Sequence, residues 1–391
     1  MNGRLTGVLA AAAALLAAGL STGAQIYYLL AAALLVIVLL GLAAVVWTIL
    51  TVRVTLRGVK PRVTRGDSLM TVFTVRHASL LPVAEIRVSM GSFSPGAAAQ
   101  EISVRTPPLT ERTFRHTIAC PHRGVFEAGV TRVSARDLFG LVRLSRNPGM
   151  KKVSVEVMPR LNAAEPMELR ASDMGPEFRA TASEDTASPS DVRAWQDGDS
   201  LKKVHWKLSM RRREIMVRTY EESARPDTLI IPDLSEITAL KDQQLSAEDR
   251  ICECCLAAAN AQLSAGYPVR MPLLSARPSE ITGQFPADTA TFADALMRVA
   301  FDSPYAYEKV LMLMLARMQR TGGAVLVTAR LTAKCADLAL RMQRSGIRTK
   351  FVWVTDDPRE ESLALLERLK MENVLVECVD PWKDERAKAA F

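Results

Sequence analysis

Two apolar runs at the start of the chain constrain its fold more than any other feature. The first, residues 5–20, is rich in Ala and Leu, and the second, residues 26–50, follows a short polar turn at 21–25; neither run carries a charge. A helix needs about 20 apolar residues to cross the hydrocarbon core of a bilayer. The second run exceeds that length and the first reaches it with its flanks. We therefore predict a transmembrane helical hairpin at residues 1–50.

The flanking charges predict how this hairpin is oriented. A cleaved signal peptide is the alternative for the first run, but the second run follows too closely to leave a useful extracellular N-terminus. The turn between the runs has no basic residue, whereas Arg53, Arg57, Lys60, Arg62 and Arg65 follow the second run. The positive-inside rule then predicts a two-pass protein of the cell membrane, with everything after residue 51 in the cytoplasm.

Residues 51–160 predict a domain of short strands. They are enriched in β-branched residues, alternate partially between apolar and polar, and are separated by Gly, Pro and Asp turns. The expected strands are 52–56, 70–75, 86–90, 113–119, 129–135 and 153–158. Their even spacing is typical of a small antiparallel, β-sandwich-like all-β domain.

The pattern changes after residue 226 to apolar strands that alternate with helices. We expect strands at 228–232, 269–274, 324–328, 349–355 and 374–378, and helices at 247–265, 291–301, 305–320, 332–344 and 360–371. Near-continuously apolar strands separated by amphipathic helices indicate a parallel, doubly wound α/β sheet. The predicted domains are therefore 51–160, a linker or flap at 161–226, and an α/β domain at 227–391. Gly322 and Gly323 precede a strand, so we interpret them as a turn and not as a phosphate loop.

Three of the six cysteines cluster in one predicted helix. Cys252, Cys254 and Cys255 have the spacing C-x-C-C, with no matching second pair and no histidine knuckle. A zinc site is the alternative, but this spacing does not favour one. We expect reduced, buried thiols in a cytosolic compartment.

The segment 191–222 holds two tryptophans, a histidine and many charges, which composition alone does not explain. The residues singled out are Arg193, Trp195, Gly198, Asp199, His205, Trp206, Lys207, Arg218 and Glu221. In this order they resemble the signature of the domain of unknown function 58 (DUF58) family, bacterial membrane proteins with a von Willebrand factor A-like domain. Residues 123–126, 137–141 and 157–160 resemble the family's upstream elements. The resemblance covers nearly the whole chain and implies the hairpin as well.

Three interpretations of this signature stay open. Asp199 and Glu221 can form charge-assisted bonds to Arg193 or Arg218, with His205 and Trp206 packed against them, which would make a structural polar network. A binding surface is the second interpretation. The third is a hydrolase-type enzyme using Asp199 and His205, although no serine or cysteine nucleophile motif accompanies them.

The resemblance also implies where a metal would bind. In von Willebrand A domains a D-x-S-x-S loop after the first strand, aided by a distant Thr and Asp, holds a divalent cation, and such oxygen ligands suit magnesium. Here Asp233 and Ser235 supply the first two ligands, but Ile237 replaces the second serine. Arg330, two residues after Thr328, would oppose a cation. We expect a degenerate magnesium site, no bound metal and no other cofactor.

The resemblance implies a partnership with a MoxR-type AAA+ ATPase in assembly or envelope maintenance. We therefore expect a membrane-anchored, non-enzymatic interaction scaffold that presents the loops at the carboxyl ends of its strands, around 235–240, 329–331 and 356–361. The expected partners are the lipid bilayer, the ATPase and a second copy of the chain. The net charge of +8 leaves nucleic-acid or anionic-lipid binding through the basic run 202–218 as an alternative, with no specific nucleic acid expected.

Overall fold

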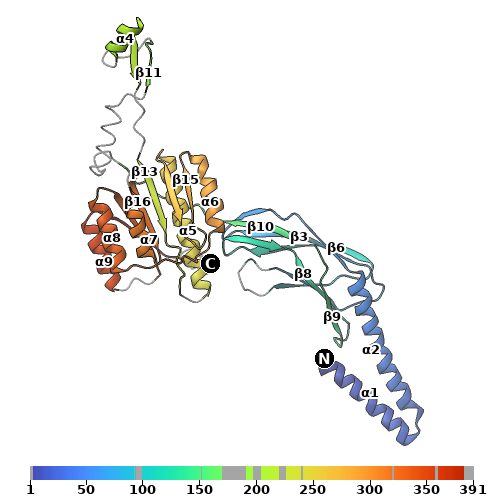
Figure 1. Cartoon of the computed structure of the whole chain (residues 1–391). Coiled ribbons are helices and arrows are strands. Elements are labelled where there is room, and N and C mark those ends of the chain that lie inside the picture. The colour runs from blue at the N-terminus through green and yellow to red at the C-terminus, as the bar shows by residue number, and fades with distance from the viewer. Residues whose placement is uncertain are drawn as a thin grey trace. The chain divides into compact units, whose positions relative to one another are not determined.

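The computed structural model describes most of the chain and divides it into two compact units. It describes residues 3–91, 93, 99–150, 152–169, 191–196, 204–219, 226–238, 241–318, 321–356 and 360–382. The first unit is Met1–Met158 and the second is Pro159–Phe391 (Figure 1).

The chain begins with two helices, α1 (Gly3–Thr22) and α2 (Gln25–Thr51). Both are long and apolar enough to span a bilayer, and most of their residues are exposed in the structure, unlike those of a soluble core helix. Gly23 turns the chain between them with a positive φ of 67°. A Cβ on Gly19 would lie 3.0 Å from the ring of Tyr28, so the glycine lets the two helices approach closely. The predicted helical pair is confirmed, and it is compatible with membrane insertion.

Ten strands follow in the described part of the first unit. They are β1 (Arg53–Arg57), β2 (Arg62–Thr64), β3 (Ser68–His77), β4 (Glu85–Met90), β5 (Gln100–Val104), β6 (Thr110–Ala119), β7 (Gly124–Ala128), β8 (Val130–Arg136), β9 (Arg143–Arg146) and β10 (Val153–Met158). They form three sheets with the orders β1-β3-β6, β5-β4-β8-β9 and β2-β10-β7. Phe73, Ile86 and Val155, one from each sheet, are fully buried in a shared core. The expected antiparallel pairing holds except between β2 and β10, which are parallel.

The last two turns of α2 are part of this β unit. Val45 and Ile49 pack with Ala135 of β8 in a small buried cluster. The hydroxyl of Thr48 and Nε2 of the buried His77 lie 3.2 Å apart. The hairpin is therefore continuous with the strands, whereas the sequence predicted a separate membrane segment that ends at residue 50.

The second unit contains a six-stranded sheet. Its strands are β13 (Asp227–Pro232), β14 (Val269–Leu273), β15 (Ser279–Gly283), β16 (Thr321–Thr328), β17 (Arg348–Val354) and β18 (Leu375–Val379). The order is β15-β14-β13-β16-β17-β18, and every neighbouring pair is parallel except β14 and β15. Numbered along the chain this is 3-2-1-4-5-6, the order of a doubly wound fold.

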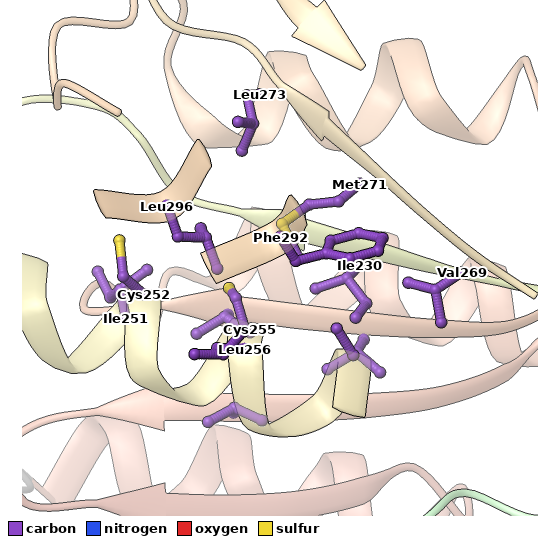
Figure 2. Close-up of a cluster of buried hydrophobic side chains, with 14 of the residues drawn as sticks. Ile230, Ile251, Cys252, Cys255, Leu256, Val269, Met271, Leu273, Phe292 and Leu296 are labelled. Carbon is purple, nitrogen blue, oxygen red and sulfur yellow. The ribbon is translucent and has the colours of Figure 1, made fainter. Parts of the chain in front are cut away.

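Helices cover both faces of this sheet. They are α5 (Lys241–Ser264), α6 (Thr289–Arg298), α7 (Tyr307–Leu315), α8 (Ala333–Arg344) and α9 (Glu360–Met371), with a short 3₁₀ turn at Pro286–Asp288. The core on the α5 and α6 face includes Ile230 and Phe292 (Figure 2). Cys252 and Cys255 are fully buried in it, so the prediction of buried thiols is confirmed for these two, whereas Cys254 is half-buried. The core on the opposite face is formed by α7, α8 and α9.

The start of the predicted linker packs on the α/β domain. Met167 and Leu169 belong to the core under α5, and the backbone carbonyl of Met167 accepts a hydrogen bond from the side chain of Gln262 at 3.3 Å. Gly322 and Gly323 lie within β16, so interpreting them as a turn was wrong. A Cβ on Gly323 would come within 2.5 Å of the Met167 side chain, so the glycine leaves room for this crossing segment.

A small module carries the signature. β11 (Asp191–Ala194) pairs antiparallel with β12 (Met216–Thr219), and the helix α4 (Trp206–Arg212) lies between them in sequence. Val204 forms an isolated antiparallel bridge with Val217. These residues make a helix backed by a two-stranded ribbon.

Candidate functional site

The sheet has a topological switch point between β13 and β16. The chain leaves β13 through α5 toward β14 on one side, and it leaves β16 through α8 toward β17 on the other. The loops after the two neighbouring strands therefore diverge, and in open α/β sheets ligands bind in the crevice that this opens at the carboxyl ends. Asp233 follows β13 directly and Thr328 ends β16, so both side chains stand at this crevice.

Asp233 is the centre of a hydrogen-bond network at the switch point. The side chain is 2% exposed. One carboxylate oxygen accepts a hydrogen bond from the hydroxyl of Thr328 at 2.7 Å, and the other accepts from the backbone N–H of Ser235 at 3.1 Å and from the Ser235 hydroxyl. A buried carboxylate is tolerated only when such donors surround it. The structure thus brings together Asp233 and Ser235, the two residues to which the resemblance pointed, and adds Thr328 to them.

The Arg330 side chain lies against the oxygen atoms of Asp233 and Ser235. Its guanidinium donates a hydrogen bond to the Ser235 hydroxyl and lies 3.6 Å from the Asp233 carboxylate. The sequence predicted that Arg330 would oppose a cation, and the structure shows it reaching into the oxygen cluster. Ile237 packs against the core instead of facing the cluster. The residues present do not fit a resident divalent cation, because it would have to displace the guanidinium.

The walls of the crevice are held by two buried aromatic side chains. The hydroxyl of Tyr307 donates to the backbone carbonyl of Ile231 at 2.8 Å, and the indole N–H of Trp353 donates to the carbonyl of Ala329 at 3.3 Å. Burial, followed by the nearby Asp233 carboxylate, raises the pKa of Tyr307 well above its usual value. The hydroxyl therefore stays neutral and acts as a structural donor. These two hydrogen bonds hold the end of β13 and the residue before Arg330 in place.

A pocket of about 490 Å³ opens at the end of the neighbouring strand β14. Its lining residues are Leu273, Ser275, Ala276, Arg277, Ser279, Ala295, Arg298, Val299, Ala300 and Asp302. The backbone N–H of Ser303 donates to the carbonyl of Leu234 at 3.0 Å, which joins the pocket wall to the Asp233 loop. Arg277 and Arg298 are exposed. The pocket rim therefore carries two basic side chains and the acidic Asp302.

Sequence reasoning missed this pocket. Arg277 and Arg298 lie in a loop and at a helix end, where isolated arginines are common. Only the pairing of β14 with β15, and the packing of α6 beside them, brings these side chains to one place. No local motif in the sequence signals that arrangement.

The structure places His205 as the cap of α4. Its Nδ1 accepts a hydrogen bond from the backbone N–H of Leu208 at 3.2 Å. The hydroxyl of Ser209 donates to the backbone carbonyl of His205 at 3.1 Å and accepts from the N–H of Met216 at 2.8 Å, which ties the helix to β12. An imidazole that caps a helix with Nδ1 has one nitrogen committed to structure.

The outer face of α4 is both apolar and basic. Trp206 is 61% exposed and Met210 is 81% exposed, one helical turn apart. Lys207 and the run 211–213 are exposed beside them. One of the three interpretations packed Trp206 against a polar network with Asp199 and Glu221, which lie outside the described residues; the structure shows the indole largely exposed. An exposed face that combines apolar and basic side chains suits a partner surface that is both apolar and acidic.

Several predicted signature residues cannot be placed. Gly198, Asp199 and Glu221 lie outside the described residues, as does the side chain of Arg218, so the pairing of Asp199 with His205 stays a prediction. Arg193 donates to the backbone carbonyl of Ala194 at 3.1 Å. Trp195 is half-buried, and its backbone N–H donates to the backbone carbonyl of Ile215 at 2.8 Å.

Comparison with protein families gives one match. Residues 191–378 match the model of a family described as "Protein of unknown function DUF58". The match covers the small signature module and the α/β sheet as far as β18. No curated protein matches the chain.

Solved structures give only remote similarities. A β-glucosidase from Listeria innocua is 12% identical over 27% of this chain and 16% of its own, with a TM-score of 0.18. Cwp6 from Clostridium difficile is 10% identical over 84% of this chain and 37% of its own, with a TM-score of 0.20. A GH20 exo-β-N-acetylglucosaminidase from Vibrio harveyi is 10% identical over 81% of this chain and 59% of its own, with a TM-score of 0.16. The chain thus spans less than two thirds of each, and similarities this weak carry no argument.

Proposed function

We propose that the protein is a membrane-anchored, non-enzymatic scaffold whose von Willebrand A-like sheet binds a partner protein at its switch point. The observation that carries this proposal is the position of Arg330. Its guanidinium is anchored on one side by Asp233 and Ser235, yet the side chain is 46% exposed. A held arginine with a free face is suited to bidentate recognition of a carboxylate.

This arrangement replaces a bridging metal by a fixed side chain. In an A domain with the full D-x-S-x-S pattern, the oxygen ligands of this loop hold a divalent cation. Here the guanidinium stands in that place, so a partner carboxylate meets Arg330 directly. Binding at this surface then requires no metal, and Arg277 and Arg298 extend the attraction toward an acidic segment.

The chemistry of the described residues supports a binding role more than an enzymatic one. The Asp233 carboxylate is engaged by two hydroxyls, an N–H and a guanidinium. The His205 ring serves as a helix cap. A general base needs a free lone pair directed at its substrate. The alternative of a hydrolase that uses Asp199 and His205 predicts lost activity in a folded His205→Ala variant, whereas the capping role predicts lost thermal stability.

The family resemblance suggests the partner. It favours a MoxR-type AAA+ ATPase, with the chain acting in assembly of other proteins or in envelope maintenance. Two apolar helices would tether the scaffold to the membrane, and the arginines after α2 favour a cytoplasmic location of the sheet, where such an ATPase works. An acidic surface segment on the ATPase is the expected ligand of Arg330.

Crosslinking in native membranes tests this proposal. Wild-type chain, Arg330→Glu and a control, Arg341→Glu, are purified from membranes after crosslinking under nucleotide-trapped conditions. Arg341 is an exposed arginine in the last turn of α8, away from the switch point. We expect the ATPase to be recovered with wild type and Arg341→Glu and to be strongly reduced with Arg330→Glu. Recovery of no AAA+ ATPase with any variant would refute the partnership, and equal recovery would refute the role of Arg330.

The exposed face of α4 favours binding to an anionic surface as a second candidate function. Trp206 and Met210 beside a basic run can insert into an anionic membrane surface, and the same run could bind nucleic acid. Nucleic-acid binding predicts an affinity that falls steeply with salt. Fluorescence titration of the full chain with an oligonucleotide over a range of salt concentrations checks that prediction, and absence of binding at low salt would reject it.

A further inference from the structure

The turn between β8 and β9 presents two large apolar side chains to solvent. Leu138 is 56% exposed and Phe139 is 59% exposed at the tip of this turn. Exposed Leu and Phe side chains side by side at the end of a hairpin are unusual on a soluble surface. Nothing that we have assigned to the switch point or to α4 uses them.

The turn is rigidly built. The buried carboxylate of Asp137 accepts hydrogen bonds from the backbone N–H of Phe139 at 3.1 Å and of Val142 at 2.7 Å. Gly140 has a positive φ of 70°, and its missing side chain leaves room for the Arg136 guanidinium. The apolar tip is therefore held outward by its backbone and does not depend on its own side chains for its shape.

The turn lies against the second apolar helix. A Cβ on Gly41 of α2 would come within 3.3 Å of the Asp137 carboxylate and 3.4 Å of its Cβ, so Gly41 is where the turn and the helix meet. β8 and β9 also contact α2 along its last turns (Figure 1). The position of Leu138 and Phe139 is thus fixed along the length of this helix.

The helix pair gives the depth of that position. Gly41 lies about 24 Å along α2 from Gln25, at 1.5 Å per residue, and the hydrocarbon core is about 30 Å thick. Gly19 of α1 lies beside Tyr28 of α2, so in an antiparallel pair Arg4 comes level with Ala43. A charged Arg4 marks the edge of the hydrocarbon core. Gly41 therefore lies just inside that edge.

The surroundings of the tip suit a lipid headgroup region. Arg136 and Arg143 face each other at the base of the turn, and Arg143 and Arg146 are exposed. Trp47, which is 42% exposed on α2, lies at the level where interfacial aromatic residues gather. Apolar side chains flanked by arginines match a bilayer boundary with anionic lipids.

We propose that Leu138 and Phe139 insert into the bilayer at the boundary between hydrocarbon and headgroups, so that the β unit rests on the membrane as well as being tethered to it. The inference depends on membrane insertion of α1 and α2, which is part of the proposed function. Together with the packing of α2 on β8 and β9, this contact would fix the tilt of the β unit against the membrane plane. The occupant of this surface is the phospholipid bilayer.

A label at the tip tests this inference. The full chain carries Cys378→Ser, because Cys378 is its exposed thiol, whereas burial raises the pKa of the half-buried Cys254 to about 12 and keeps it unreactive. Phe139→Cys, Leu30→Cys and Met70→Cys are each labelled with the fluorophore NBD. Leu30 is exposed in the second turn of α2, and Met70 is exposed near the start of β3, far from His77, where that strand meets α2. The proteins are reconstituted in phosphatidylcholine and phosphatidylglycerol vesicles with and without nitroxide-bearing lipid.

We expect lipid-borne nitroxide to quench the labels at 30 and 139 several-fold more than the label at 70. Quenching at 30, with the label at 139 no more quenched than that at 70, would overturn the inference and leave the membrane anchor standing. A label at 139 that is shielded from water but unquenched by lipid, with crosslinks between copies, would assign the tip to self-association and also overturn it. Absence of quenching at 30 would overturn the anchor and the inference together.

Discussion

Replacing Asp233 by alanine tests how much the switch-point network contributes to folding. The substitution removes the acceptor of the Thr328 hydroxyl, of the Ser235 N–H and of the Ser235 hydroxyl, and it removes the anionic partner of Arg330. The Thr328 hydroxyl retains a second acceptor, the carbonyl of Arg330 at 3.1 Å. The Ser235 N–H is left buried without its acceptor. Asp233→Asn keeps the volume and one acceptor oxygen.

The expected loss of stability follows from these contacts. A hydrogen bond to a charged group is worth about 1.5–3 kcal/mol, and losses within one network do not add fully. The ion pair contributes little because Arg330 is half exposed. We expect Asp233→Ala to lower the free energy of unfolding by about 3 kcal/mol and Asp233→Asn by about 1 kcal/mol. For a unit of this size that corresponds to a drop in Tm of about 6–12 °C and about 2–4 °C.

Thermal unfolding of the full chain in detergent measures both values. Intrinsic tryptophan fluorescence is suited to it, because the buried Trp353 binds the Ala329 carbonyl in the same loop as Arg330. The matched control is Asp302→Ala, which removes an exposed carboxylate that accepts one N–H, that of Ala276, at 2.9 Å. If Asp233→Ala lowered the Tm no more than this control, or if Asp233→Asn lowered it as much as Asp233→Ala, the hydrogen bonds of Asp233 would not stabilise the fold.

Three further outcomes are expected. The Tm of the wild type should not respond to magnesium or EDTA, whereas Arg330→Ala opens the oxygen cluster and should gain a magnesium-dependent rise in Tm; a rise in the wild type would contradict the account. Glu85 has its pKa lowered to about 2 by its hydrogen bonds with Arg87 and Ser103, so the stability it contributes is present above about pH 4.5 and lost as pH falls toward 2. Between about pH 4.5 and 2, the free energy of unfolding should therefore depend less on pH for Glu85→Gln than for wild type. A membrane-impermeant maleimide should label Cys378 only when it is added to the cytoplasmic side of the membrane. Labelling of Cys378 in intact cells would contradict the predicted topology.

Patterns that extend over many residues predicted the fold well. The uncharged runs identified α1 and α2, and the near-continuous apolar segment of β16, buried along its whole length, is typical of an inner parallel strand. β15 was missed because Ser279–Gly283 is a short, mostly polar edge strand. The strands β2, β5, β7 and β9 were missed for the same reason, since short exposed strands carry little alternation. Their pairing depends on contacts that are distant in sequence.

The sequence predicted which residues belong to the candidate site but not how their side chains are arranged. The resemblance pointed to Asp233 and Ser235, and the position of Arg330 argued against a cation. That the guanidinium enters the oxygen cluster depends on how the loops after β13 and β16 diverge, which no local pattern encodes. The capping role of His205 was equally hidden, because histidine is not among the preferred N-cap residues.

The central claim is that Arg330 presents a metal-free binding site on a membrane-anchored scaffold. Its most direct test is the affinity of the purified MoxR-type ATPase for the full chain in nanodiscs, measured by interferometry in the presence of EDTA. We predict binding by wild type and Arg341→Glu, and a loss of at least about tenfold for Arg330→Glu, equivalent to about 1.4 kcal/mol. Binding that requires magnesium, or that is unchanged by Arg330→Glu, would contradict the claim.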